Sequence, residues 1–166
     1  MDKFFYLIAQ LPMLSFEGGL PVTVEEYLDE ARKWLRPADY RILSGVDIFD
    51  TSTEKRDAPA IVREYRAFER AFRSDLAGWR QALRTGEDYV PSTFPPALVR
   101  GANPLENERN LLEHRWRFLD EREANHHFDL EFLILYHLKL QILSRLDSFD
   151  AERGRQVFKE VSGIRE

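Results

Sequence analysis

The chain of 166 residues contains no cysteine, and that absence excludes several kinds of chemistry. Disulfide bonds, thiolate nucleophiles and thiolate metal ligands all require this side chain. A chain without cysteine is compatible with a reducing cytoplasm. An excess of positive charge is also lacking, because the formal net charge is −5. Nucleic-acid-binding proteins usually carry a basic excess that neutralises phosphates, so we expect no nucleic-acid partner.

Motifs that would name a reaction are lacking as well. Gly18 and Gly19 are followed by Leu-Pro and not by the Lys-Ser/Thr pair of a phosphate-binding loop. No serine lies in the Gly-x-Ser-x-Gly pattern of a nucleophile elbow. The sequence therefore predicts no catalytic residue and no bound cofactor.

What the chain does have is a long apolar stretch, Phe128 to Phe149. Its apolar residues cannot share one stripe, and a helix that is apolar on all sides must be enclosed by protein or lipid. Charged residues interrupt the run, whereas a membrane span needs about 20 mostly apolar residues. We therefore expect no membrane span and a central core helix over residues 129–147.

The residue pattern of the N-terminal half predicts helices that are separated by glycine and proline. Residues 4–14 are apolar and fit a strand or a helix, and we expect a buried first element and not a signal peptide. Thr23 and Glu26 form a capping box ahead of a helix, and a short helix follows over residues 37–43. A long helix is then predicted from a cap at Asp57 to Gly86. Its apolar stripe consists of Ile61, Tyr65, Phe68, Phe72, Leu76, Trp79 and Leu83. Gly78 lies beside this stripe, and close packing of another helix would explain it.

The C-terminal half follows a proline-rich connector, residues 87–102. Asn103 and Pro104 predict the start of a helix that runs to residue 124. Its inward-facing residues are Leu105, Leu112, Trp116 and Leu119. Asp150 predicts the cap of a last helix, residues 151–162, with Val157, Phe158 and Val161 inside. The fold class is all-α, a compact bundle-like arrangement of five to six helices in a single domain, 1–166, with parts 1–86 and 103–166 on either side of the connector.

Histidines offer the one metal-site hypothesis. Glu123 and His126 have the Glu-x-x-His spacing of di-iron helical bundles, but such bundles use two of these motifs, and the sequence has one. We expect His126 and His127 to be turn and surface residues, and His137 to be a hydrogen-bonded core or interface residue. The sequence accordingly assigns no metal ligand, and a metal-dependent bundle enzyme is kept as an alternative.

Charge is distributed unevenly along the chain. Residues 54–84 carry eight cations and five anions, and residues 103–131 carry four cations and eight anions. The two helices either pack side by side with complementary rims, or they form a bipolar surface that docks on a multi-subunit partner. Trp34, Tyr40 and Trp79 are candidate aromatic anchors for docking, or else ordinary core residues.

Four segments carry a resemblance to a known family. They are KFFYLIAQLPML at 3–14, NPLE at 103–106, RWRFL at 115–119 and YHLKLQI at 136–142, together with the helix at 150–161. In these segments the chain resembles a bacterial family of uncharacterised proteins encoded with the subunits of V-type (A/V-type) ATP synthases. The resemblance covers most of the chain in order, whereas residues 47–102 are less distinctive.

The resemblance implies a role in ion transport without catalysis by this chain. It points to a cytoplasmic component, peripheral to the inner membrane through the ATPase and standing in for the helical C-type subunit. The expected function is that of a non-catalytic subunit or assembly and coupling factor that contacts stalk or stator subunits. The alternatives are the metal-dependent enzyme and an unrelated cytoplasmic adaptor module. Homo-oligomerisation stays open.

Overall fold

The computed structural model describes residues 3–53 and 57–163, and this part of the chain forms helices and no strand. The elements are α1 (Lys3–Gln10), α2 (Val24–Trp34), α3 (Pro37–Ser44), α4 (Ala60–Thr85), the 3₁₀ helix η1 (Pro96–Val99), α5 (Pro104–Glu123) and α6 (Leu130–Ser162). The prediction of a compact all-α fold is confirmed. None of these helices combines the length and the apolar character that crossing a membrane requires.

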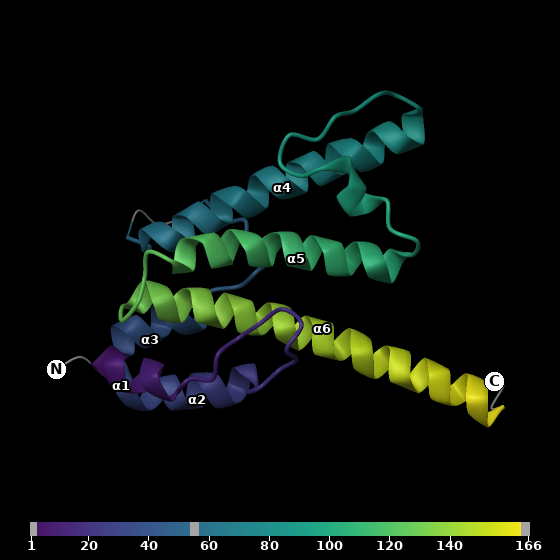
Figure 1. Ribbon diagram of the computed structural model, residues 1–166. Coiled ribbons are helices and arrows are strands. Elements are labelled where there is room, and N and C mark those ends of the chain that lie inside the picture. Colours follow the sequence, from purple (N-terminus) through teal and green to yellow (C-terminus); the bar gives the residue numbers. More distant parts are fainter. Residues whose placement is uncertain (1–2, 54–56, 164–166) are drawn as a thin grey trace.

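Helix α6 is the centre of the fold. Helices α1, α2 and α3 lie along one side of α6, α5 lies along another, and α4 lies beyond α5 (Figure 1). The residues from Leu133 to Leu140 are all buried, which explains why this stretch is apolar on every face. The side chain of Asp129 caps the helix by accepting a hydrogen bond from the backbone N–H of Phe132 at 2.8 Å.

The predicted break at Asp150 is wrong, because α6 is one helix of 33 residues. Asp150 lies inside it, and no glycine or proline interrupts the chain between residues 147 and 151. Val157, Phe158 and Val161 were expected inside the fold, but they are 51%, 66% and 82% exposed. The end of α6 therefore projects away from the other helices (Figure 1).

The N-terminal helices follow the local signals closely. Residues 3–10 form a helix and not a strand. The expectation of a buried first element is wrong for most of it, because Leu7 is the one residue of α1 that is buried. Thr23 and Glu26 form the predicted capping box, with both reciprocal hydrogen bonds at 3.1 Å. Helix α3 ends at Gly45.

Helix α4 and the connector fit together through side chains. Pro59, and not Asp57, occupies the N-cap position, and Gly86 ends the helix with a φ of 72°. The prediction that another helix packs on Gly78 is wrong, because the ring of Tyr89 from the connector occupies that space. Leu83 is 67% exposed, whereas its neighbour Ala82 is buried, so the buried side of α4 ends at Ala82 and not at the predicted Leu83.

The buried residues form two clusters. The larger surrounds α6 and includes residues of α1, α2, α3, α4 and α5. The smaller lies between α4, the connector and α5, and it consists of Phe72, Leu76, Trp79, Phe94 and Leu111. Leu112, Trp116 and Leu119 are buried as predicted, but Leu105 is 41% exposed.

Candidate functional site

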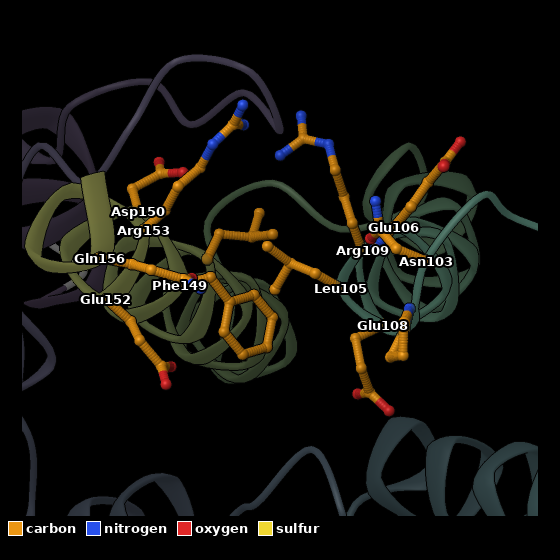
Figure 2. A pocket seen from close by; sticks show the side chains of 12 residues that line it. Asn103, Leu105, Glu106, Glu108, Arg109, Phe149, Asp150, Glu152, Arg153 and Gln156 are labelled. Carbon is orange, nitrogen blue, oxygen red and sulfur yellow. Dashed lines mark hydrogen bonds between the residues drawn. The ribbon is translucent and has the colours of Figure 1, made fainter. Parts of the chain in front are cut away.

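A groove of about 940 Å³ lies between the start of α5 and residues 146–156 of α6 (Figure 2). Leu105 from α5 meets Leu146 and Phe149 from α6 there, so the floor of the groove is apolar. Charged side chains stand at its edges: Glu106, Glu108, Arg109, Asp150, Glu152 and Arg153. Leu105 is exposed because α5 begins where α6 has moved away from it.

The end of α6, which begins beside this groove and extends past it, is exposed to solvent. Every residue from 150 to 163 is exposed, and we call residues 150–162 the α6 arm. A free helix of this length is marginal in water, although here the packed part of α6 provides its nucleus. Its exposed apolar side chains make the arm a candidate binding element.

A second apolar surface lies near the opposite end of α6. Phe5 contacts Phe128 with ring centroids 5.1 Å apart, and Tyr6 stacks on Trp34 at 5.9 Å. Phe5 and Tyr6 also contact each other, at 5.8 Å, so the four rings are continuous. We call them the aromatic face. Phe5, Tyr6 and Phe128 are 47%, 45% and 50% exposed, and clustered exposed rings of this kind mark interaction sites.

The predicted aromatic anchors have different surroundings. Trp34 is half-buried in the aromatic face, and its indole N–H donates to Glu30 at 3.1 Å. Tyr40 is half-buried beneath the guanidinium of Arg32. Trp79 belongs to the smaller core cluster, so it is a core residue and does not lie in the aromatic face.

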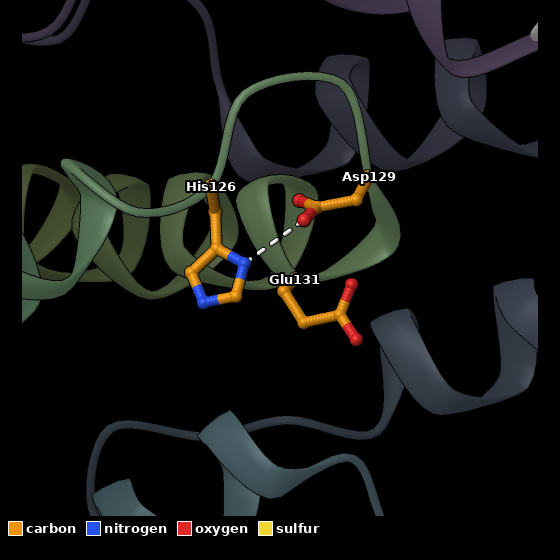
Figure 3. Close-up of side chains that lie close together, drawn as sticks. All are labelled: His126, Asp129 and Glu131. Carbon is orange, nitrogen blue, oxygen red and sulfur yellow. Dashed lines mark hydrogen bonds and ion pairs between the residues drawn. The ribbon is translucent and has the colours of Figure 1, made fainter.

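The predicted metal motif does not form as its spacing suggested. The carboxylate of Glu123 pairs with Lys139, while His126 Nδ1 lies 2.9 Å from Asp129 Oδ2 (Figure 3). His126, Asp129 and Glu131 have potential ligand atoms within 4.8 Å of one another, and this trio could offer one imidazole and two carboxylates to a cation. Asp129 also caps α6, so the same residue has a structural role.

His137 is a buried structural residue, as predicted. Its Nδ1 lies 2.9 Å from the carbonyl oxygen of Leu43, so this nitrogen carries the proton and donates. Its Nε2 accepts from the side-chain amide of Gln141 at 3.1 Å. Burial lowers the pKa of His137, and these bonds use the neutral ring. His137 thereby ties α6 to the end of α3.

Complementary charges join α4 to α5. Arg115 on α5 pairs with Glu69 on α4 at 2.8 Å, and Arg122 lies 3.6 Å from Glu64. These pairs agree with side-by-side packing of the two helices. The predicted basic segment includes residues 54–56, which lie outside the described residues.

The sequence did not reveal the groove or the aromatic face. Both are formed by segments far apart in the chain, and periodicity within one helix carries no information on where another helix ends. The sequence did contain one local sign that the arm is not buried. Gly154 is a poor helix former and has no side chain to pack into a core.

Part of the chain matches a known protein family. A family described as a protein of unknown function, DUF2764, matches residues 98–164, which is less than half of the chain. The matched region contains α5 and α6, including the groove between them and the arm. Neither the curated proteins nor the solved structures include a match.

Proposed function

We propose that this chain is a non-catalytic helical subunit, or an assembly and coupling factor, of a V-type ATP synthase. It acts by protein–protein interaction with stalk or stator subunits, on the cytoplasmic side of the membrane. Nucleotide hydrolysis then belongs to other subunits of the complex.

The aromatic face is the observation that carries this proposal. Its four rings lie side by side, and three of them keep about half of their surface in water. Covering the exposed part of each ring would favour association by roughly 1 kcal/mol. Aromatic side chains also supply a large share of the binding energy at protein interfaces.

The resemblance to the ATP-synthase-associated family supplies the identity of the partner. Residues 3–14, which carry part of that resemblance, form α1 and contribute Phe5 and Tyr6 to the aromatic face. Residues 3–14 therefore carry part of the resemblance and also contribute two of the four rings of the aromatic face.

Affinity capture of the tagged chain from gently solubilised membranes of its own cell tests the proposal. We expect the catalytic and stalk subunits of the V-type ATPase to be recovered with the wild-type chain. The double variant Phe5→Ser/Phe128→Ser should lose them, whereas Leu83→Ser, at an exposed leucine of α4, should retain them. Failure to recover any ATPase subunit while that complex remains intact would refute the proposal, and recovery unaffected by the double variant would refute the role of the aromatic face.

A further inference from the structure

Arginines form a row along one side of α4, and we call the following six residues the arginine row: Arg63, Arg66, Arg70, Arg73, Arg80 and Arg84. They recur at intervals of three, four or seven residues, so at 100° per residue they share an arc of about 100° on the helix. Because a helix rises by about 1.5 Å per residue, the row is about 30 Å long. Helix α4 lies at the margin of the molecule, beyond α5 (Figure 1), and four of the six arginines are exposed.

Two arginines of the row pair with carboxylates. Arg66 Nε lies 2.7 Å from Asp50 Oδ2. Arg73 Nε lies 2.9 Å from Glu69 Oε1, but Glu69 is also bound by Arg115, so these three side chains together keep one positive charge. The charge of the row is therefore offset fully at Arg66 and only in part at Arg73.

Other arginines of the row keep their full charge. Arg70 donates to the backbone carbonyl oxygens of Thr51 and Ser52, at 3.2 Å and 3.0 Å, and these acceptors carry no net charge. Arg80 and Arg84 form no ion pair with any residue in the described ranges 3–53 and 57–163. The row therefore presents an excess of positive charge to solvent, above all in the second half of α4.

The surface around the arginine row lacks the apolar centre of a typical protein interface. The exposed residues that share its arc are Ala77 and Gln81, and Ala67 and Ser74 border it. Leu83, the one large apolar side chain of α4 that is exposed, lies about 60° outside the arc. Protein partners usually gain most of their binding energy from a few apolar or aromatic anchors. The row instead fits a partner that is bound through its negative charge.

A flat anionic surface fits the row better than a nucleic acid does. A helix that reads DNA must enter the major groove, whereas α5 packs along one flank of α4 and Tyr89 of the connector packs on another. The phosphates of a lipid bilayer lie in a plane that a straight row can touch along its whole length. Each guanidinium group can also bind two phosphate oxygens at once.

We propose that the arginine row binds the surface of a bilayer that contains anionic lipids, with α4 lying parallel to the membrane plane. Basic side chains near such a surface are attracted by its negative potential. The chain as a whole carries a net charge of −5, so the remainder of the molecule is strongly negative and is repelled by the same surface. The row is thereby the side that faces the membrane. It is separate from the aromatic face, so this proposal does not depend on the ATPase proposal.

Sedimentation of the full chain with lipid vesicles tests the proposal. The wild-type chain should bind vesicles of equal parts phosphatidylcholine and phosphatidylglycerol but not vesicles of phosphatidylcholine alone, and added salt should release it. Arg73→Gln/Arg80→Gln/Arg84→Gln should lower the partition coefficient about a hundredfold, because each basic side chain near the surface strengthens binding about fivefold. All three positions are exposed, so circular dichroism should show unchanged helix content. Arg80→Gln/Arg84→Gln, which breaks no ion pair, should lower the coefficient about thirtyfold.

The matched control removes three cations from another exposed helix surface. Arg153→Gln/Arg155→Gln/Lys159→Gln in the α6 arm changes the net charge by the same amount and should leave vesicle binding intact. Equal weakening by the two triple variants, or equal binding to both kinds of vesicle, would overturn the proposal. A wild-type chain that binds neither kind would also overturn it and would favour an acidic protein surface as the occupant. A DNA duplex that displaces the chain from the vesicles at equal phosphate concentration would overturn it in favour of a nucleic acid.

Discussion

Glu69 accepts two hydrogen bonds from the guanidinium of Arg115, at 2.9 Å from Nε and 2.8 Å from Nη2. The Glu69 side chain is fully buried and that of Arg115 is 6% exposed. Phe49 and Phe72 lie against the same guanidinium. Helix α5 is thus joined to α4 by a bidentate ion pair that packs among aromatic rings. Removing either partner would leave the charge of the other buried and unpaired.

Substitution of Glu69 by alanine should therefore be strongly destabilising. We expect the free energy of unfolding to fall by about 3–5 kcal/mol, because Arg115 is left buried without its partner. The double variant Glu69→Leu/Arg115→Met should recover most of that loss, since no unpaired charge remains. Urea denaturation measures all of these values.

The exposed pair of Glu113 and Arg117, at 3.4 Å, is the matched control. Glu113→Ala should lower the free energy of unfolding by less than about 1 kcal/mol, because solvent screens this interaction. If Glu69→Ala and Glu113→Ala lowered the free energy of unfolding by the same amount, burial would not explain the contribution of the pair of Glu69 and Arg115.

Gly78 should tolerate alanine only when Tyr89 is removed. A Cβ at residue 78 would lie 2.6 Å from the Tyr89 ring, whose hydroxyl donates to Asp75. Although alanine favours a helix by about 1 kcal/mol over glycine, displacing the ring breaks a hydrogen bond to a carboxylate that contributes about 1.5–3 kcal/mol. We expect Gly78→Ala to destabilise the wild-type chain by roughly 1 kcal/mol and to stabilise a Tyr89→Ala chain by about the same amount.

A double-mutant cycle in chemical denaturation measures that coupling. Additive effects of the two substitutions would mean that the connector does not pack on Gly78 in solution.

His137 should make stability depend on pH below about 6.5, the ordinary pKa of histidine. Burial lowers the pKa of His137 in the folded state, so between the folded and unfolded pKa values the unfolded chain binds more protons. The free energy of unfolding must therefore decrease as the pH falls through this range, with a slope of up to about 1.4 kcal/mol per pH unit. His114, whose pKa is also lowered by burial, adds to the slope in the same direction.

His137→Asn tests this dependence because asparagine retains an N–H donor near the carbonyl oxygen of Leu43. The variant should show a shallower decrease of stability from pH 7 to pH 5 than the wild-type chain. His127→Asn, at an exposed position, is the matched control for replacing a histidine by asparagine. A slope that is identical in wild-type and His137→Asn chains would show that His137 does not contribute.

Local chemistry made much of the fold predictable. Thr23 and Asn103 were recognised as helix caps because a capping side chain bonds to an N–H only three residues away. Gly86 was recognised as a helix end for the same kind of local reason. The enclosed position of α6 followed from its apolar composition alone.

The errors arose where the surroundings of a residue decide its role. Leu105 and Phe158 have the right spacing for inward-facing residues, but they are 41% and 66% exposed, because α5 and α6 cover them only in part. Asp150 has the character of a cap, yet the helix continues because the residues around it also favour helix. The aromatic face and the groove unite residues from distant segments, so no pattern within one segment could predict either surface.

The most direct test of the ATPase account is purification of the complex through a tag on a different subunit. The V-type ATP synthase should be isolated from gently solubilised membranes by its catalytic subunit, and this chain should be quantified by mass spectrometry. The account predicts that the chain is present at a fixed ratio to the stalk subunits, and that Phe5→Ser/Phe128→Ser removes it without dissociating the rest. An intact ATPase that contains none of this chain would contradict the account.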